Sequence, residues 1–197
     1  MSEIEHSTAD IRRNPAQFRL KKTVALVGMM GAGKTAVGRA VAEKLGVAFL
    51  DSDAEIEAAA NRSVPEIFQR DGEPFFRRRE TEVIRRLLET ETCILSTGGG
   101  AYLAEVNRQN ISEKGVALWL DASLDLLWVR VKHKDTRPLL RTADPFATLS
   151  EIYASRTPIY GLAELRVPCD AGLSIDAMAE RVIATLLSRG DVLEIIE

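Results

Sequence analysis

The stretch GMMGAGKT, residues 28–35, constrains the fold of this 197-residue chain more than any other feature. It follows the apolar run TVALV and precedes a segment in which Val37, Val41 and Leu45 recur every four residues, as on one helix face. Glycines at this spacing let successive backbone N–H groups point at an anion, and the N-terminus of the helix adds a positive dipole. The spacing G-x-x-x-x-G-K-[ST] between a strand and a helix therefore predicts a nucleoside triphosphate site.

Different residues of this loop are expected to contact different parts of a magnesium-bound triphosphate. Lys34 supplies an ammonium group to neutralise phosphate charge and is a candidate catalytic residue, while Thr35 supplies a hydroxyl that can ligate Mg²⁺. Kinases, ATPases and GTPases share the motif, so it does not identify the phosphoryl acceptor. The nucleotide-binding residues that we expect here are Gly31, Ala32, Gly33, Lys34, Thr35 and Ala36.

The length of the chain suits one α/β domain, which we place at residues 21–190. Residues 1–20 show no hydrophobic periodicity and contain an Asn-Pro pair, so we expect a mobile N-terminal extension. Residues 191–197 are expected to form a C-terminal tail.

Charge and cysteine content limit the classes of partner. The 26 Lys and Arg residues nearly balance 29 Asp and Glu residues, which argues against a broad basic surface for nucleic acid. No apolar run approaches the roughly 18 residues of a membrane span, and Glu3, Glu5 and Asp10 are unlike a signal peptide. Cys93 and Cys169 lie far apart in apolar runs, as buried thiols do in a reducing compartment. We expect a cytoplasmic protein without a membrane partner.

Five apolar, strand-like runs alternate with helical segments along the chain. This alternation predicts an α/β fold of the P-loop NTPase type, in which helices cover both faces of a five-stranded parallel sheet in three layers. The runs lie at residues 23–28, 47–51, 92–97, 115–121 and 165–170.

Two acidic residues, Asp51 and Asp53, end the second of these runs. In an extended backbone their side chains share one side, at the carboxyl end of a strand, where parallel sheets bind ligands. A helix cap is the competing interpretation, because Asp and Ser are both favoured before a helix. One of the three residues 51–53 can act as the cap, which leaves a carboxylate without a structural reason.

The third run leads into Gly98, Gly99 and Gly100. Consecutive glycines let a ligand approach the backbone closely, although a flexible turn would have the same composition. Further along, the segment at about residues 132–145 is basic, lacks apolar periodicity and is bounded by prolines, which predicts a mobile loop.

Six motifs occur along the chain in the order GMMGAGKT, D-x-D, GEPFFRRRE, STGGG, RPLL and SRTPIY. Taken together, these motifs resemble those of shikimate kinases across residues 22–189. The phosphate loop alone is common, but its combination with the other motifs is specific. The resemblance implies a fold like that of nucleoside monophosphate kinases, with a substrate-binding region at about 52–80 and a lid at about 132–145. It also implies transfer of the γ-phosphoryl group of ATP to the 3-hydroxyl of shikimate, in aromatic amino acid biosynthesis.

The resemblance also implies roles for acceptor-site residues. Asp53 would meet the acceptor hydroxyl as a catalytic residue. Arg77 and Arg156 would bind the shikimate carboxylate, for which a planar guanidinium is well matched, and Glu80 would hold Arg77 in position. The three glycines at 98–100 would bring backbone N–H groups to the substrate.

Further roles concern the nucleotide. Asp51 would reach Mg²⁺ together with Thr35, and Arg137 of the lid would reach the transferring phosphate. Arg130 is a candidate for stacking on the adenine, with an ordinary exposed helix charge as the alternative. Cys169 stands in the expected adenine pocket, where we would expect a small polar residue.

Two other functions stay open at this stage. A sugar-acid kinase of the gluconate type would have a similar loop and fold, although the paired arginines and the triple glycine favour shikimate. A non-catalytic, nucleotide-dependent regulator would tolerate the loss of Asp53, Arg77 or Arg137, yet all three are present. For the oligomeric state, we expect a monomer.

Overall fold

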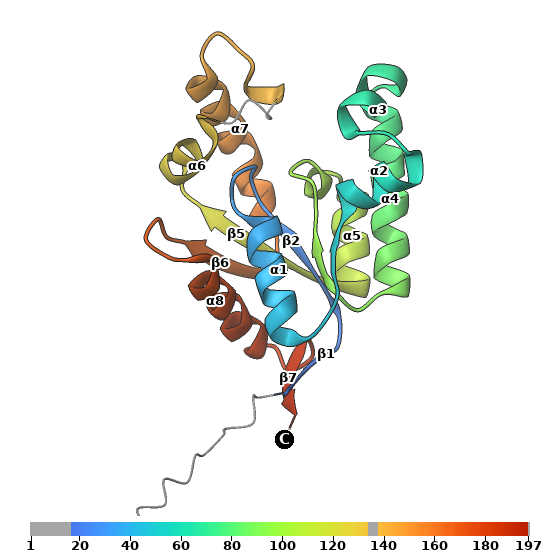
Figure 1. Ribbon diagram of the computed structural model, residues 1–197, viewed down its shortest axis with the longest axis vertical. Helices are drawn as coiled ribbons and strands as arrows, with labels where there is room; N and C mark the ends of the chain where they lie inside the picture. The colour runs from blue at the N-terminus through green and yellow to red at the C-terminus, as the bar shows by residue number, and fades with distance from the viewer. Residues whose placement is uncertain (1–16, 134–137, 197) are drawn as a thin grey trace, which may run out of the picture.

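The computed structural model describes residues 17–133 and 138–196. At its centre is a five-stranded sheet in the order β3-β4-β2-β5-β6, in which each pair of neighbouring strands is parallel (Figure 1). The predicted parallel sheet of five strands is confirmed. Its strands are β2 (Thr23–Val27), β3 (Phe49–Asp51), β4 (Ile94–Ser96), β5 (Gly115–Ala122) and β6 (Leu165–Cys169).

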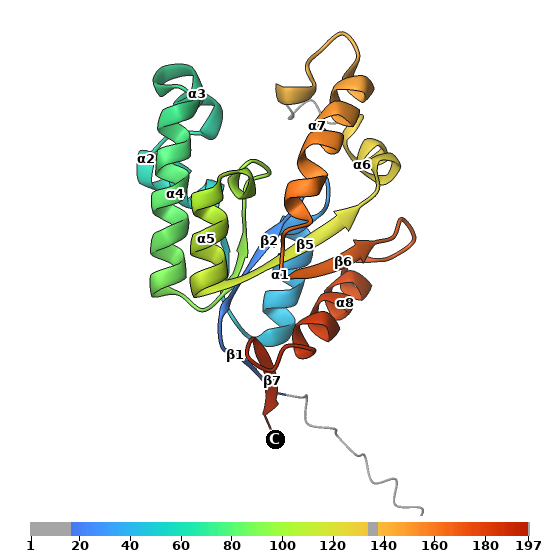
Figure 2. The ribbon, with the colours of Figure 1, turned by 180° about the vertical axis from the view of Figure 1, so that it is seen from behind.

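Helices cover both faces of this sheet, which is why its central strand is apolar throughout. All five residues of β2 are buried. Helices α1 and α8 lie on one face, whereas α4, α5 and the C-terminal part of α7 lie on the other (Figures 1 and 2). The helices are α1 (Lys34–Leu45), α2 (Ser52–Ala60), α3 (Val64–Asp71), α4 (Glu73–Thr90), α5 (Glu105–Lys114), α6 (Leu124–Val131), α7 (Pro145–Tyr160) and α8 (Ile175–Leu187), with short 3₁₀ turns η1 (Ala101–Leu103) and η2 (Pro138–Leu140).

Two groups of helices rise beyond the carboxyl ends of the strands. One contains α2, α3 and the N-terminal part of α4, and the other contains α6, η2 and the N-terminal part of α7 (Figure 1). The ends of β2, β3 and β4 open between them, so side chains from both groups can reach one ligand. Within the described residues, no helix combines the length and the apolar character needed to cross a bilayer.

Both ends of the described chain differ from the prediction. Strand β1 (Gln17–Leu20) pairs antiparallel with β7 (Leu193–Ile196), so part of the predicted extension at 1–20 and of the predicted tail at 191–197 is ordered. Ladder hydrogen bonds and flanking ion pairs hold these segments, and the partners lie too far apart in sequence for a local pattern to show the pairing. Residues 1–16 lie outside the described part of the chain.

Candidate functional site

The loop between β2 and α1 has the backbone conformation that its sequence predicts. Gly28, Gly31 and Gly33 have φ angles of 138°, 82° and 99°, which residues with side chains rarely adopt. The loop also packs tightly, because a Cβ on Gly31 would lie 2.7 Å from Cγ1 of Val131. These glycines shape the loop for an anion at the N-terminus of α1.

Lys34 begins α1 and places its charge inside this loop. The residue is buried, and its Nζ donates hydrogen bonds to the carbonyl oxygens of Gly28 at 2.8 Å and Met29 at 3.0 Å. The next residue, Thr35, is exposed, and its hydroxyl lies 3.5 Å from Oδ2 of Asp51. A cation and two oxygen ligands therefore converge on the space in front of the loop.

The cap interpretation of the acidic pair is confirmed for Asp51, and the cap uses only one of its two carboxylate oxygens. Its Oδ1 caps α2 by accepting hydrogen bonds from the N–H groups of Asp53 at 3.0 Å and Ala54 at 3.3 Å. Its Oδ2 faces Thr35 and stays available for a ligand. Asp53 is thus the carboxylate that capping leaves unexplained.

Asp53 lies in the first turn of α2 with its carboxyl group turned inward. Its Oδ1 is buried and has no hydrogen-bond partner within residues 17–133 and 138–196. Burial is the main cause that raises the pKa of Asp53 to about 6; nearby Asp51 contributes to the rise, and the charges of Lys34 and Arg77 oppose it. A carboxylate with such a pKa and a vacant acceptor suits the removal of a proton from a bound hydroxyl.

Arg77 and Glu80 form the expected pair on α4, with Nη1 of Arg77 2.8 Å from Oε2 of Glu80. Glu80 is fully buried, whereas Arg77 keeps some contact with solvent. The reason is helical spacing, since Glu80 lies four residues from both Phe76 and Ile84, which face the interior. The pKa of Glu80 is raised to about 6, because the effect of burial exceeds the opposing charge and hydrogen bond of Arg77.

The triple glycine packs directly against these side chains. A Cβ on Gly98 would lie 2.9 Å from Oδ1 of Asp53 and 3.2 Å from Oε1 of Glu80. On Gly100 it would lie 2.4 Å from Nη2 of Arg77. Close approach, rather than flexibility, therefore explains why Gly98 and Gly100 carry no side chain.

Arg156 reaches the same place from the other group of helices. It is half-buried near the end of α7, and its Nη1 lies 3.7 Å from where a Cβ on Gly99 would be. Arg77 and Arg156 thus approach the glycine loop from α4 and α7, which are far apart in sequence. The structure brings together all of the predicted acceptor-site residues.

The residues of the phosphate loop and of the acceptor site line two adjoining cavities, with volumes of about 490 and 310 Å³. Met30, Asp53, Gly98 and Gly99 line both cavities, so the two share a wall. The larger one is lined by the phosphate loop with Asp51, Arg130, Cys169, Leu173, Ile175 and Met178. The smaller one is lined by Val64, Pro65, Phe68, Phe76, Arg77, Glu80, Gly100, Leu139 and Arg156.

Several apolar residues of the smaller cavity are absent from the sequence prediction. Val64 and Phe68 lie one turn apart on α3 and form one side, and Leu139 of η2 faces it from the other group of helices. The available signal was the i, i+4 spacing of Val64 and Phe68 in an otherwise polar helix. Nothing in the local sequence places Leu139 there.

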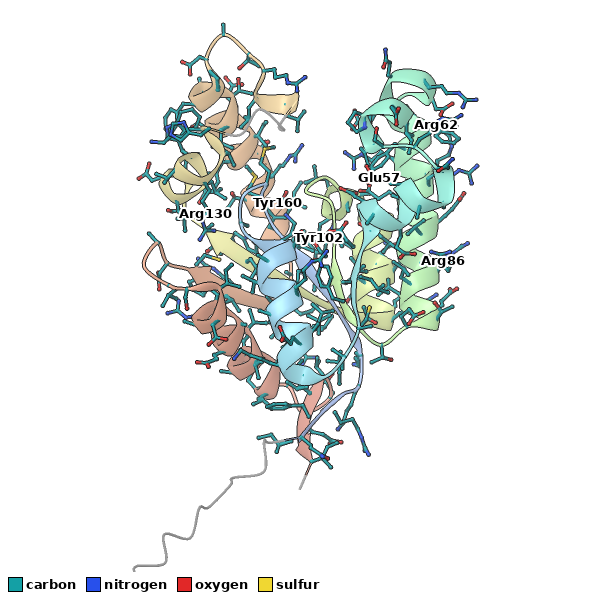
Figure 3. The ribbon with its side chains drawn as sticks, in the orientation of Figure 1. Glu57, Arg62, Arg86, Tyr102, Arg130 and Tyr160 are labelled. Atoms are coloured by element: carbon teal, nitrogen blue, oxygen red, sulfur yellow. The ribbon has the colours of Figure 1, made fainter. Side chains whose placement is uncertain are left out.

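Arg130 lies on α6 and binds the phosphate loop, so it is not the ordinary exposed charge of our alternative interpretation. It lies beside this loop (Figure 3), and its Nη1 donates to the carbonyl oxygens of Gly31 at 3.1 Å and Ala32 at 3.2 Å. Cys169 is buried in the larger cavity, and desolvation raises the pKa of its thiol to about 11. The thiol is therefore neutral and forms an apolar wall. Arg137, the predicted lid residue, lies outside the described residues.

The chemistry of Thr35 and Asp51 fits a magnesium ion. Mg²⁺ binds hard oxygen ligands and usually takes one or two protein groups, with water and substrate phosphates completing its shell. Thr35 and Asp51 present a hydroxyl and a carboxylate oxygen 3.5 Å apart. Across the described residues, no group of three or more His, Cys, Asp or Glu could hold a metal. A metal here would thus complete its coordination with water and phosphate oxygens.

Comparison with known proteins gives consistent matches. A family model described as shikimate kinase matches residues 30–187. The chain is 64% identical over 195 residues to the shikimate kinase of Ruegeria pomeroyi, covering 99% of this chain and 100% of that protein. It is 59% identical over 176 residues to that of Cereibacter sphaeroides, covering 89% and 88% of the two chains. A solved shikimate kinase from Acinetobacter baumannii in complex with shikimate has a TM-score of 0.80 at 36% identity, covering 86% of this chain and 94% of that one.

Proposed function

The chain belongs to the shikimate kinase family, and from this membership we propose that it transfers the γ-phosphoryl group of ATP to the 3-hydroxyl of shikimate. It is accordingly an ATP-dependent kinase, a transferase. One observation carries the assignment. The cavity at the phosphate loop shares a wall with a second cavity, which is lined by a carboxylate that can accept a proton, Asp53, and by two arginines, Arg77 and Arg156.

ATP is proposed to occupy the larger cavity. Its phosphates lie against residues 31–36, where backbone N–H groups, the dipole of α1 and Lys34 neutralise their charge. Lys34 already lies inside the loop, where its Nζ donates to the carbonyl oxygens of Gly28 and Met29. The adenine lies toward Cys169 and Met178, with Arg130 holding the loop from the other side.

Shikimate is proposed to occupy the smaller cavity, with its carboxylate between Arg77 and Arg156. Two guanidinium groups suit a carboxylate because each offers paired N–H donors in a plane. The ion pair with Glu80 fixes Arg77, and Val64 and Phe68 supply apolar contacts to the ring. The 3-hydroxyl then points toward the wall that the two cavities share.

The reaction at this wall is the attack of the 3-hydroxyl oxygen on the γ-phosphorus. A bond forms between that oxygen and phosphorus, the bond to the β-phosphate oxygen breaks, and ADP leaves with the electron pair. Asp53 accepts the hydroxyl proton at Oδ1, which the described structure leaves vacant. Positioning and charge neutralisation contribute more to such a transfer than a strong base does.

The proposal also covers the metal ion, the lid, the oligomeric state and the location of the protein. Mg²⁺ would be held by Thr35 and Asp51 and would offset the charge of the phosphates. Arg137 is proposed to approach the transferring phosphate from the lid. We also propose a monomeric enzyme of the cytoplasm, since one chain lines both cavities and its two cysteines are free and buried.

The test separates the acceptor from the nucleotide. ADP release should depend on shikimate and not on gluconate, and Arg77→Ala or Arg156→Ala should weaken shikimate binding by about 2–5 kcal/mol. That is roughly 30-fold to several thousand-fold in affinity. Lysine at either position should also bind poorly, because an ammonium group cannot copy the planar fork.

Arg79→Ala is the matched control, because Arg79 is exposed on the same helix and pairs with Glu82 at 2.6 Å. We expect this variant to bind shikimate normally, and ATP affinity to change little in all of the variants. Full activity on a neutral amide analogue of shikimate would contradict the carboxylate site. So would weakened ATP binding together with normal shikimate binding in the Arg77 and Arg156 variants.

A further inference from the structure

Tyr160 ends the motif SRTPIY and has no part in the reaction described above. It is the last residue of α7 and is completely buried (Figure 3). Its hydroxyl donates a hydrogen bond to the carbonyl oxygen of Gly99 at 2.5 Å. A buried phenol that contacts the middle of the triple glycine lies close enough to the acceptor cavity to influence it.

Arg156 lies one helical turn before Tyr160, so their side chains are neighbours on α7. Both side chains reach Gly99, since Nη1 of Arg156 lies 3.7 Å from where a Cβ on that glycine would be. The guanidinium of Arg156 also acts on the Tyr160 hydroxyl, since its charge and hydrogen bonding lower the pKa of that phenol. Arg156 and Tyr160 therefore meet at one point of the glycine loop.

The chemistry of the hydroxyl fixes the direction of these bonds. Burial raises the pKa of Tyr160, although the charge and hydrogen bond of Arg156 oppose the shift, so the phenol is neutral. A neutral phenol has one proton, which it donates to the carbonyl of Gly99. Toward Arg156 it can then only accept, which matches a guanidinium because that group only donates.

The aromatic ring makes this hydroxyl a rigid support. Tyr160 packs against Trp119 of β5, with ring centroids 6.4 Å apart and planes tilted by 32°. A tyrosine has two side-chain torsions, and here both are restrained by complete burial. An arginine that rests on such a support loses less conformational entropy when it binds a carboxylate.

We propose that Tyr160 is a positioning residue for the acceptor site, in which its hydroxyl, anchored on the carbonyl of Gly99, holds Arg156 in the geometry that binds the substrate carboxylate. The proposal rests on the proposed function, because it assumes that Arg156 binds that carboxylate. It assigns to Tyr160 an effect on acceptor binding that acts through another residue. Burial of the ring alone would give Tyr160 a role in packing and none in affinity.

The first experiment is Tyr160→Phe, which keeps the ring and removes only the hydroxyl. We expect the KM for shikimate to rise about 10-fold or more, because a hydrogen bond to a charged group is lost. The KM for ATP should stay within about twofold, and kcat should fall less than the shikimate KM rises. Tyr102→Phe is the control, since Tyr102 is also buried but is not among the described residues that line either cavity.

The second experiment asks whether the effect passes through Arg156. In an Arg156→Ala background, Tyr160→Phe should change shikimate affinity by less than about twofold, because the residue to be positioned is gone. Equal effects in both backgrounds would overturn the proposal, as would an unchanged shikimate KM in Tyr160→Phe alone. Thermal unfolding of each variant separates a general loss of stability from a loss of affinity.

The outcomes also distinguish this inference from the proposed function. If Arg156→Ala binds shikimate normally, the carboxylate site itself is wrong, and the role of Tyr160 fails with it. If Arg156→Ala binds poorly while Tyr160→Phe binds normally, only the positioning role is overturned.

Discussion

Replacing Asp53 by asparagine should abolish phosphoryl transfer and, at neutral pH, should also make the protein more stable. The inward-facing Oδ1 of Asp53 lacks a hydrogen-bond partner in the described part of the chain. An ionised carboxylate at this position is poorly solvated compared with the same group in the unfolded chain. Asparagine removes that charge and keeps the shape of the side chain. Its amide can also donate to the nearby Glu80.

The size of the effect follows from the pKa of Asp53, which rises from 3.8 to about 6 on folding. Each pKa unit corresponds to about 1.36 kcal/mol, so the full shift amounts to about 3 kcal/mol. Because the side chain keeps some contact with solvent, we expect about 2 kcal/mol. The folded pKa lies above the unfolded one, so the carboxyl favours folding below pH 3.8, and this contribution is lost as the pH rises through about 6.

Urea denaturation without nucleotide, at pH 5 and pH 8, measures this difference. The variant should exceed the parent protein in free energy of unfolding at pH 8, and by a smaller margin at pH 5. Asp125→Asn is the control, because Asp125 occupies the first turn of α6 in an exposed position and reports the effect of the helix dipole alone. Equal or lower stability of Asp53→Asn at pH 8 would refute the argument from buried charge, and normal turnover would remove Asp53 from the reaction.

Two further changes test the phosphate loop and the glycine loop. Lys34→Ala should lower kcat at least about 100-fold while leaving the circular dichroism spectrum unchanged, because backbone N–H groups alone cannot balance the phosphate charge; near-normal turnover would contradict the site. Gly100→Ala should weaken shikimate binding about 10-fold or more, since its Cβ would lie 2.4 Å from Nη2 of Arg77. Gly172→Ala, whose Cβ would meet no described atom within 4 Å, should bind normally in the same titration.

The parts of the molecule that could be predicted are those in which one local pattern decides the structure. The phosphate loop, its glycine conformations and the start of α1 follow from glycine and lysine spacing, and the five strands follow from apolar runs. Helix α5 has a weak hydrophobic signal of its own, because only two of its ten residues, Asn107 and Ile111, are buried.

Most features of the site that the sequence analysis did not predict depend on contacts between distant segments. The burial of Glu80 could have been predicted, because its spacing of four from Phe76 and Ile84 puts it on the inner face of α4. The contact of Tyr160 with Gly99 joins residues 61 positions apart, and no local pattern specifies it. The same applies to the pairing of β1 with β7.

That terminal pairing gives the chain an almost circular course. Gln17 and Ile196 are opposite each other in the β1–β7 ladder, at the pole of the molecule away from both groups of helices (Figure 2). A linker of a few residues could therefore join these positions, and the chain could be opened instead at the exposed residues 91–92, between α4 and β4. Such a circular permutant would carry every segment of the two cavities uninterrupted, although it would be synthesised in a different order.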